Sequence, residues 1–302
     1  METKITIFSE ILRDLESQIG TRDVSQLVLR AFNTSMKDFK PKSHDDIKKQ
    51  FENLVHIISN TKPRFGVLTN FFNEIVTSFD EKSPSSYNSN KCKLFFDNKI
   101  NNLLKSENKD YEHLLSNATD INVKNKRILI HDHSHTVHDV LLNYKKKKIN
   151  FNVVIAEQET DKTHSNIEFL HEHDIPFQVV PAYMISHIYN TIDIAFFGAL
   201  TLKDTMHFVM DPGSSSLISE LFIAKIPSYM FLEVNKFSLW KSKKRGEVFM
   251  HEHKRRHHNK PIEYNRIKYS HDRVSTEFFE KIITDKESFT QKGIKKYFDS
   301  LI

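Results

Sequence analysis

Short apolar runs alternate with helix-like segments across residues 151–237. The runs are rich in Val, Ile and Phe, a composition typical of strands that are buried on both faces. They cover residues 151–156, 177–180, 193–197 and 229–232, and an earlier run covers 127–130. Buried strands that alternate with helices predict a parallel sheet covered by helices on both sides. Ligands of such sheets bind at the carboxyl ends of the strands.

The first 80 residues show helical periodicity instead. Apolar residues recur every three to four positions, as in the helices of a bundle. Ser43 is predicted to cap one of these helices, with Asp45 and Asp46 in its first turn. The predicted architecture is an amino-terminal helical domain over residues 1–118, followed by an α/β domain with a parallel sheet over residues 119–302. From Arg273 onward the spacing predicts a return to helix.

Composition narrows the classes of protein that fit. Only 6 of the 302 residues are glycine, and neither a GxGxxG nor a GxxxxGK[ST] phosphate loop occurs. Cys92 is the single cysteine, so an internal disulfide and a Cys-only zinc site are excluded. The chain has no apolar run long enough to span a membrane and no signal-peptide layout at its start. We therefore expect a cytoplasmic protein without membrane contact.

The net charge of +5 is modest, but one segment is strongly basic. Residues 241–260 hold eight Lys or Arg and four His against only two acids, Glu247 and Glu252. An exposed, solvated loop explains this composition, and so does a contact for an acidic protein or for RNA. Phe249 is the one aromatic residue in the segment, which argues against a stacking platform for single strands.

A histidine cluster follows the first predicted strand, where residues 131–138 read HDHSHTVH. Alternating histidines in this position can bind a metal, as in the HxHxDH pattern of metallo-hydrolases. The pattern departs at His135 and Thr136, and no second cluster of ligands follows. The alternative is a strand-to-helix turn with surface histidines. Ser134 lies between histidines but lacks the GxSxG elbow of a nucleophile, and we predict neither a metal nor a cofactor.

The chain contains, in order, the segments SENK at 106–109, ILIHDHSHTV at 128–137, IAE at 155–157, IPFQVVP at 175–181, DIAFFGA at 193–199, AKIPSYMFLEVNKF at 224–237 and TDKESFT at 284–290. In their order, and in their nearly gapless spacing from Phe151 to Phe237, they resemble the initiation factor 2B family. That family comprises the alpha, beta and delta subunits of the factor and the isomerases of 5-methylthioribose-1-phosphate and ribose-1,5-bisphosphate. The length of the chain favours the alpha subunit, and the resemblance implies a helical domain followed by a Rossmann-like domain.

The resemblance implies a regulatory, non-catalytic subunit of the guanine-nucleotide exchange factor complex for translation initiation factor 2. Such a subunit is a homodimer that bridges the complex and helps to sense phosphorylated initiation factor 2. Its implied partners are a second copy of itself, the other subunits of the complex, and initiation factor 2, above all its phosphorylated alpha subunit. No DNA partner is implied.

Two departures from the isomerases argue against an enzyme. The isomerases carry Cys directly after the histidine of the first strand and Asp after Gly-Ala, whereas this chain has Asp132 and Leu200. Isomerisation of a sugar phosphate needs an acid and a base, and Leu200 can be neither. The alternative is a sugar-phosphate isomerase or metal-dependent hydrolase of the same fold that uses His131 and Asp132.

The positions that bind anions in the family have also changed. His135, Glu159 and Glu107 replace positions held by Arg or Gln, and the family's glycine-rich loop corresponds to residues 205–214, with Met210 and Asp211 in place of Asn and Lys. Acids at these positions would repel a phosphate unless they turn to solvent.

Two sets of candidate residues follow. The resemblance places the first in a vestigial ligand pocket at the strand ends: His131, Ser134, Glu157, Gly213, Ser214, Glu233 and Lys236. The second set comes from the apolar pattern, because adjacent apolar pairs widen a helical stripe beyond one face. This set would form an exposed apolar stripe at the homodimer interface: Phe278, Phe279, Ile282 and Ile283. The alternative is that these residues pack inside the chain.

Overall fold

The chain folds into a helical unit and a sheet unit. The computed structural model describes residues 2–39, 42–61, 65–82, 89–239, 250–256 and 261–302. Residues 1–113 and 235–237 form the helical unit, and residues 114–234 and 238–302 form the sheet unit. The helices come first and the mostly parallel sheet follows, which confirms the predicted fold class.

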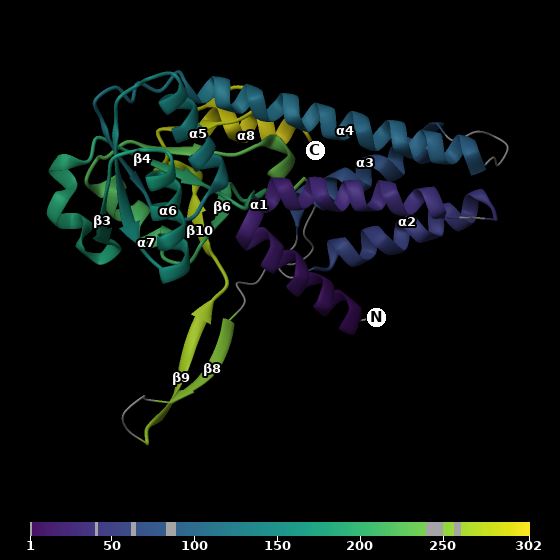
Figure 1. Cartoon of the computed structure of the whole chain (residues 1–302), viewed down its shortest axis with the longest axis horizontal. Helices are drawn as coiled ribbons and strands as arrows, with labels where there is room; N and C mark the ends of the chain where they lie inside the picture. Colours follow the sequence, from purple (N-terminus) through teal and green to yellow (C-terminus); the bar gives the residue numbers. More distant parts are fainter. Residues whose placement is uncertain (1, 40–41, 62–64, 83–88, 240–249, 257–260) are drawn as a thin grey trace. The chain divides into compact units, whose positions relative to one another are not determined.

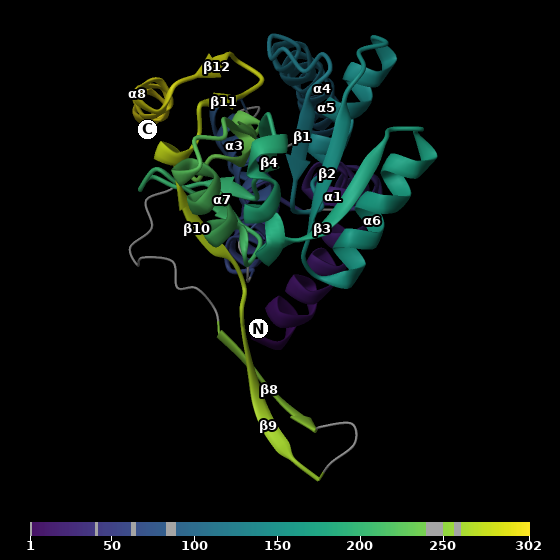
Figure 2. The same ribbon diagram turned by 90° about the vertical axis from the view of Figure 1, so that its left-hand side faces the viewer.

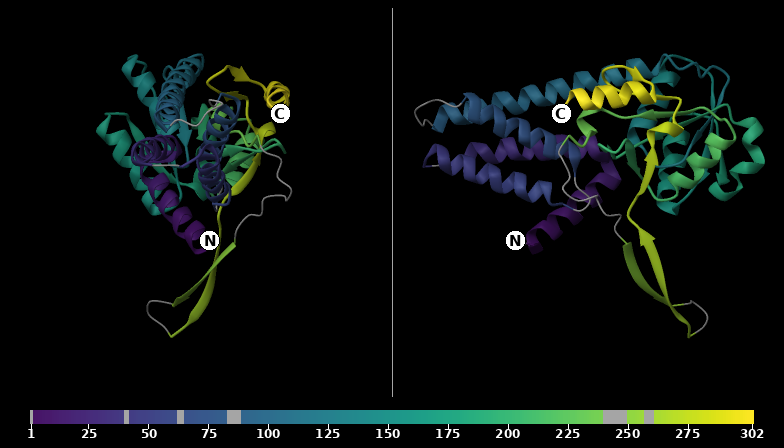
Figure 3. Two further views of the ribbon diagram at one scale, coloured as in Figure 1. Left: turned by 90° about the vertical axis from the view of Figure 1, so that its right-hand side faces the viewer. Right: turned by 180° about the vertical axis from the view of Figure 1, so that it is seen from behind.

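Long helices make up the helical unit (Figures 1 and 3). Phenylalanine side chains belong to the hydrophobic core between them. Phe51 stacks on Phe96 with ring centroids 4.6 Å apart, and Phe32 meets Phe51 edge-on at 5.1 Å. Ser43 accepts a hydrogen bond from the Asp46 amide at 3.1 Å, so the predicted helix cap is confirmed. The helices are α1 (Glu2–Asp38), which is broken at Gly20, α2 (His44–Ser59), α3 (Gly66–Lys82) and α4 (Ser89–Ala118).

A short segment from much later in the chain completes this unit. The side-chain amide of Asn70 donates to the carbonyl oxygens of Asn235 and Phe237, at 2.8 and 3.0 Å. Phe237 is fully buried. One amide therefore pairs two backbone acceptors of a segment more than 160 positions away.

The sheet unit is built on a seven-stranded sheet in the order β12-β11-β7-β4-β1-β2-β3. Every neighbouring pair is parallel except β11 and β12. All five strands expected from the apolar runs are present, and the order reverses between β1 and β4 as in Rossmann-like sheets. The strands are β1 (Arg127–Ile130), β2 (Asn152–Glu157), β3 (Phe177–Pro181), β4 (Ile194–Gly198), β7 (Ser228–Phe231), β11 (Lys281–Ile283) and β12 (Ser288–Phe289).

Helices cover the sheet, as the alternating pattern predicts. The apolar residues of α5 (His135–Lys146) and α6 (Thr160–Glu172) share one core with alternate residues of β1 and β2. Figure 2 shows α5 and α6 on one side of the sheet and α7 (Ser214–Ile223) on the other. The 3-10 helix η1 (Ala182–Thr191) connects β3 to β4, and α8 (Gln291–Ser300) follows β12.

Two smaller sheets complete the unit. One has the order β10-β6-β5 and is antiparallel, from β5 (Thr201–Leu202), β6 (His207–Met210) and β10 (Asp272–Ser275). The other is an antiparallel ribbon of β8 (Met250–Arg256) and β9 (Glu263–Tyr269). Short 3-10 helices lie at η2 (Val234–Lys236) and η3 (Thr276–Phe278).

The helix predicted from Arg273 through Ile282 is wrong, because β10, η3 and β11 occupy this stretch. The helix predicted around Ile294 and Phe298 is present as α8. Paired apolar residues such as Ile282 and Ile283 widen a helical stripe, but a strand between two layers buries consecutive residues in the same way. Strand β3 is also less buried than predicted. It is the last strand of its sheet, and Phe177 is 36% exposed.

Candidate functional site

The candidate site lies where the strand order reverses, between β1 and β4. His131 follows β1 directly, and Gly198 ends β4. The segments that follow two such neighbouring parallel strands run in opposite directions. This leaves a crevice at the carboxyl ends of the strands, where ligands bind. The sequence prediction placed the site at this edge of the sheet.

His131 is a buried, neutral hydrogen-bond acceptor. Its Nδ1 atom lies 3.1 Å from the carbonyl oxygen of Ala156, and a carbonyl can only accept, so Nδ1 carries the proton and Nε2 presents a lone pair. Burial lowers the pKa of His131 below its ordinary value of 6.5. Nε2 has no hydrogen-bond partner among the described residues, and a methyl group on Gly213 would lie 3.5 Å from it. The imidazole is therefore directed at the start of α7.

The start of α7 holds a carboxylate from the chain itself. The backbone amides of Gly213 and Ser215 both donate to Oδ2 of Asp272, the first residue of β10, at 2.9 Å each. Gly213 has a φ of 98°, a left-handed conformation that glycine adopts without strain. Unpaired amides at a helix start bind phosphates in many proteins. Asp272 uses two of these amides at the loop where the family resemblance places anion binding.

A second acid of the same loop is also paired internally. Asp211 forms an ion pair with Lys162 of α6, and both side chains are partly buried. The sequence suggested that Asp211 would repel a phosphate unless it turned to solvent. The structure instead gives it a cationic partner, so the loop contributes little net charge to the site.

Ser214 and the histidine cluster complete the surroundings of His131. The Ser214 hydroxyl is fully buried, and the part of the chain that the structure describes offers it no hydrogen-bond partner. Ser134 is the N-cap of α5 and accepts from the Val137 amide at 3.3 Å, so its hydroxyl is occupied by a structural role. Gln158 donates from Nε2 to the carbonyl oxygen of His131 at 3.0 Å and helps to fix the β1 end.

The alternative prediction of surface histidines after β1 is wrong for His131 and His138, because both side chains are buried. The rings of His138 and Phe169 stack with their centroids 3.9 Å apart. Nε2 of His138 lies 2.7 Å from Oδ1 of Asn166. Burial lowers the pKa of His138 to about 3 and that of His133 to about 4. Among the described residues, no three His, Cys, Asp or Glu side chains converge as metal ligands.

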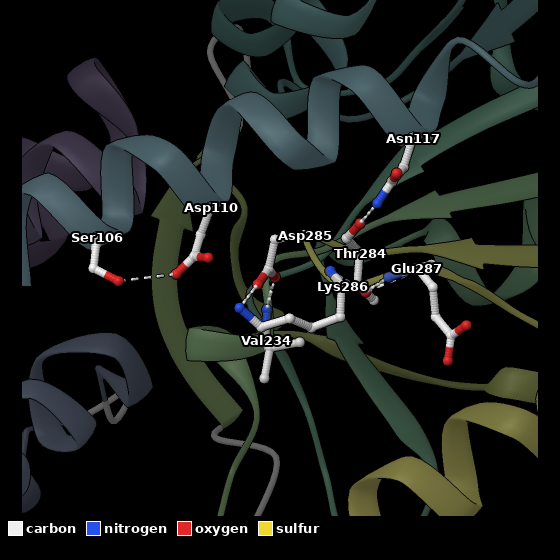
Figure 4. Close-up of polar contacts among 8 residues, drawn as sticks. All are labelled: Ser106, Asp110, Asn117, Val234, Thr284, Asp285, Lys286 and Glu287. Atoms are coloured by element: carbon white, nitrogen blue, oxygen red, sulfur yellow. Dashed lines mark hydrogen bonds and ion pairs between the residues drawn. The ribbon is translucent and has the colours of Figure 1, made fainter.

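Two buried acids follow neighbouring strands on the other side of β4. Glu233 comes shortly after β7 and is 1% exposed, and Asp285 follows β11. Asp285 accepts from the Val234 amide at 2.6 Å and pairs with Lys286 (Figure 4). The same view shows Asn117 donating to the carbonyl oxygen of Thr284, which ties the end of α4 to this loop.

The structure brings only part of the predicted pocket set together. His131, Gly213 and Ser214 meet at the start of α7. Glu157 ends β2 with an exposed side chain, and Lys236 is buried among residues of the helical unit. Glu233 is buried at the end of another strand.

The predicted exposed stripe is wrong for three of its four residues. Phe279 is 5% exposed, and Ile282 and Ile283 are fully buried in the core of this chain, because β11 lies inside the seven-stranded sheet. Phe278 remains partly exposed and contacts Phe222 with ring centroids 5.2 Å apart.

Sequence reasoning missed Asp272, Lys162 and Asn166. Asp272 lies 59 positions from Gly213, and Lys162 lies 49 positions from Asp211. No motif spacing links such pairs, since the contacts depend on how β10 and α6 pack. The helical repeat of α6 was the one available signal, because it places residues 162 and 166 on one face.

The fold and site together define an α/β protein that couples a helical unit to a Rossmann-like sheet. A model of the initiation factor 2 subunit family matches residues 18–290, so the chain belongs to that family, which is the family of the initiation factor 2B subunits. No curated protein matches the sequence. In the described part of the chain, no helix has the length and apolar character needed to cross a membrane.

Solved structures of the same fold are similar over nearly their whole length. The translation initiation factor eIF-2B of Pyrococcus horikoshii OT3 is 19% identical, with a TM-score of 0.74 over 93% of this chain and 96% of that one. A chain of the tetrameric eIF2B-beta2-delta2 complex of C. thermophilum is 15% identical, with a TM-score of 0.72 over 100% of this chain and 95% of that one. The delta subunit of eIF-2B from A. fulgidus is 12% identical, with a TM-score of 0.65 over 96% of this chain and 91% of that one.

Proposed function

We propose that this chain is an alpha-type, regulatory and non-catalytic subunit of the guanine-nucleotide exchange factor complex for translation initiation factor 2. It works in the cytoplasm, where it binds other initiation factor 2B subunits and helps to sense the phosphorylated alpha subunit of initiation factor 2. The family match over residues 18–290 supports the class of protein.

One observation carries the non-catalytic part of the proposal. Asp272 accepts the two amides at the start of α7, so the family's anion-binding loop is neutralised from within. A sugar phosphate would have to displace a carboxylate that is already hydrogen-bonded there. The chain also has Leu200 where the isomerases have an acid, and its backbone amide is bonded to Val209 in the small sheet.

The homodimer is part of the proposal, and its surface differs from the one the sequence suggested. Phe222 and Ile223 end α7 with 51% and 78% of their surface exposed, and Phe222 contacts Phe278. Exposed apolar residues that lie together are typical of an interface. We propose that this end of α7 contributes to the contact between two copies.

Substitution of Ile223 tests the homodimer by light scattering at micromolar concentration. We expect the wild type to have the mass of two chains and Ile223→Glu to be a folded monomer, because a buried charge disfavours the interface. Ile302→Glu changes an isoleucine that is 60% exposed elsewhere in the sheet unit and should stay dimeric. A wild type with the mass of one chain would contradict the homodimer.

Affinity capture from native extract, read by mass spectrometry, tests the function itself. The tagged chain should co-purify the other initiation factor 2B subunits and, after stress, initiation factor 2 with a phosphorylated alpha subunit. In parallel, purified protein should not convert 5-methylthioribose-1-phosphate or ribose-1,5-bisphosphate. Turnover that Asp132→Asn abolishes would establish the isomerase alternative instead.

A further inference from the structure

The β8–β9 ribbon is a sheet of its own. Its seven backbone pairs run from Met250 opposite Tyr269 to Arg256 opposite Glu263. Neither strand pairs with another sheet in the described residues, and the ribbon extends away from the sheet unit that carries it (Figure 2). The region that the sequence suggested as a loop therefore contains regular structure at residues 250–256.

Residues 241–270, the stretch of sequence that contains the ribbon, account for all of the net positive charge of the protein. Residues 241–270 hold ten Lys or Arg and three Glu, a net charge of +7. The rest of the chain holds 34 basic and 36 acidic residues and is net −2. A basic charge concentrated in one stretch of the sequence is the electrostatic footprint of a binder of polyanions.

The register places both acids of the ribbon on one face, and we call the other face, which holds no acid, the basic face. Alternate positions of a strand lie on opposite faces of a sheet, so the seven backbone pairs divide into a set of three and a set of four. The basic face consists of the pairs His251–Lys268, His253–Arg266 and Arg255–Tyr264. On the opposite face the bases Lys254 and Arg256 are balanced by the acids Glu252 and Glu263.

Tyr264 places an aromatic ring among these cationic positions. Its side chain is 49% exposed, and Arg266 on the same face is exposed as well. Exposed aromatic rings and guanidinium groups stack on unpaired bases, and they do so with little dependence on sequence. The basic face thus combines phosphate-binding charge with a stacking group.

We propose that the basic face of the β8–β9 ribbon binds RNA, with Arg255, Arg266 and Lys268 at the phosphates and Tyr264 on an unpaired base. Interfaces with nucleic acids are strongly positive, whereas the centres of protein interfaces are depleted of charged residues. Five of the six positions on this face are basic or histidine, which favours RNA over an acidic protein. The preference for RNA over DNA rests on the proposed role in translation initiation.

The test measures binding of the full-length chain to a fluorescein-labelled RNA hairpin with an unpaired loop, by fluorescence anisotropy at several salt concentrations. Arg255→Ala/Arg266→Ala removes two charges from the basic face and should weaken binding about tenfold or more, since phosphate contacts dominate affinity. Lys254→Ala/Arg256→Ala removes two charges from the opposite face, and its Kd should change less than about threefold. The ribbon lies outside the cores, so both variants should keep the wild-type melting temperature.

A second pair of variants isolates stacking. Tyr264→Ala should weaken binding by about fivefold or more, whereas Tyr264→Phe keeps the ring and the affinity. The proposal is overturned if the wild type does not bind the hairpin, or if both double variants lose affinity equally. Tighter binding of poly-glutamate, or equal binding of a DNA hairpin of the same sequence, would also overturn it. None of these measurements involves the other subunits, so a failure to bind RNA would leave the proposed regulatory function standing.

Discussion

Ser134 packs so closely against Gly198 that a methyl group on Gly198 would lie 2.1 Å from the Ser134 hydroxyl oxygen. Ser134 caps α5 just after β1, and Gly198 ends β4. The contact therefore joins the two strands at the point where the sheet order reverses. Glycine is required here by the close approach of another side chain, because any Cβ atom would overlap it.

Gly198→Ala should destabilise the fold by about 1–3 kcal/mol, the usual cost of overpacking a filled core. Urea denaturation measures this loss. Ser134→Gly in the same chain removes both overlapping atoms and should restore most of the stability, since a Ser-to-Gly cap change costs only a few tenths of a kcal/mol, roughly.

Gly293→Ala is the matched control for Gly198. A methyl group there would lie 3.4 Å from its nearest neighbours, Phe289 and Thr290, which is ordinary contact. Alanine in α8 should leave stability unchanged or raise it by up to about 1 kcal/mol. An equal loss in both alanine variants would contradict the proposed overlap.

Asp272→Ala should make the protein responsive to phosphate. The variant frees the Gly213 and Ser215 amides, so α7 loses about 0.5–2 kcal/mol of stabilisation at its start. Millimolar phosphate should then raise the melting temperature of the variant by mass action, and should leave the wild type unchanged.

Asp161→Ala controls for a general effect of charge, because Asp161 is an exposed acid in the first turn of α6. It should not create a phosphate response. A wild-type protein that phosphate stabilises as strongly as Asp272→Ala would show that Asp272 does not neutralise the site.

Acid should unfold the sheet unit through its buried histidines. In the unfolded chain these histidines bind protons with a pKa near 6.5, while in the folded chain the pKa of His138 is about 3 and that of His133 about 4. Below pH 6.5 the unfolded state binds more protons, so stability falls as pH falls, by up to about 1.4 kcal/mol per pH unit for each histidine.

Urea denaturation between pH 7.5 and pH 5 measures this slope. His138→Gln keeps a donor for Asn166 but cannot titrate, so its stability should depend less on pH. His164→Gln, an exposed position of α6, should follow the wild type. Equal slopes in all three proteins would rule out His138 as a source of the pH dependence.

Tyr144 should contribute to stability through its hydroxyl. The hydroxyl donates to the carbonyl oxygen of Ala118 and lies 3.3 Å from that of Ile121, in the turn after α4. Burial raises the pKa of Tyr144, so it stays a neutral donor. Tyr144→Phe removes this buried hydrogen bond and should cost about 0.5–1.5 kcal/mol, measured by thermal denaturation against Tyr183→Phe, an exposed control.

The strands of the parallel sheet were predictable because each is a short buried apolar run, and β1 was placed correctly to the residue. The region after Arg273 was not, since Phe278 and Ile282 fit a helical repeat as well as they fit η3 and β11. At the site, His131 and Gly213 follow from local sequence. Asp272 does not, because its role depends on the packing of β10 beside the start of α7.

The Asn70 contact makes the two units discontinuous in sequence. The chain passes from one unit to the other at residues 113–114, again at 234–235 and once more at 237–238. A fragment that ends at residue 118 would lack three residues of the helical unit, including the buried Phe237. A fragment that begins at residue 119 would carry those residues without Asn70. No single cut therefore separates this protein into two intact units, since each unit is made of two separate stretches of the sequence.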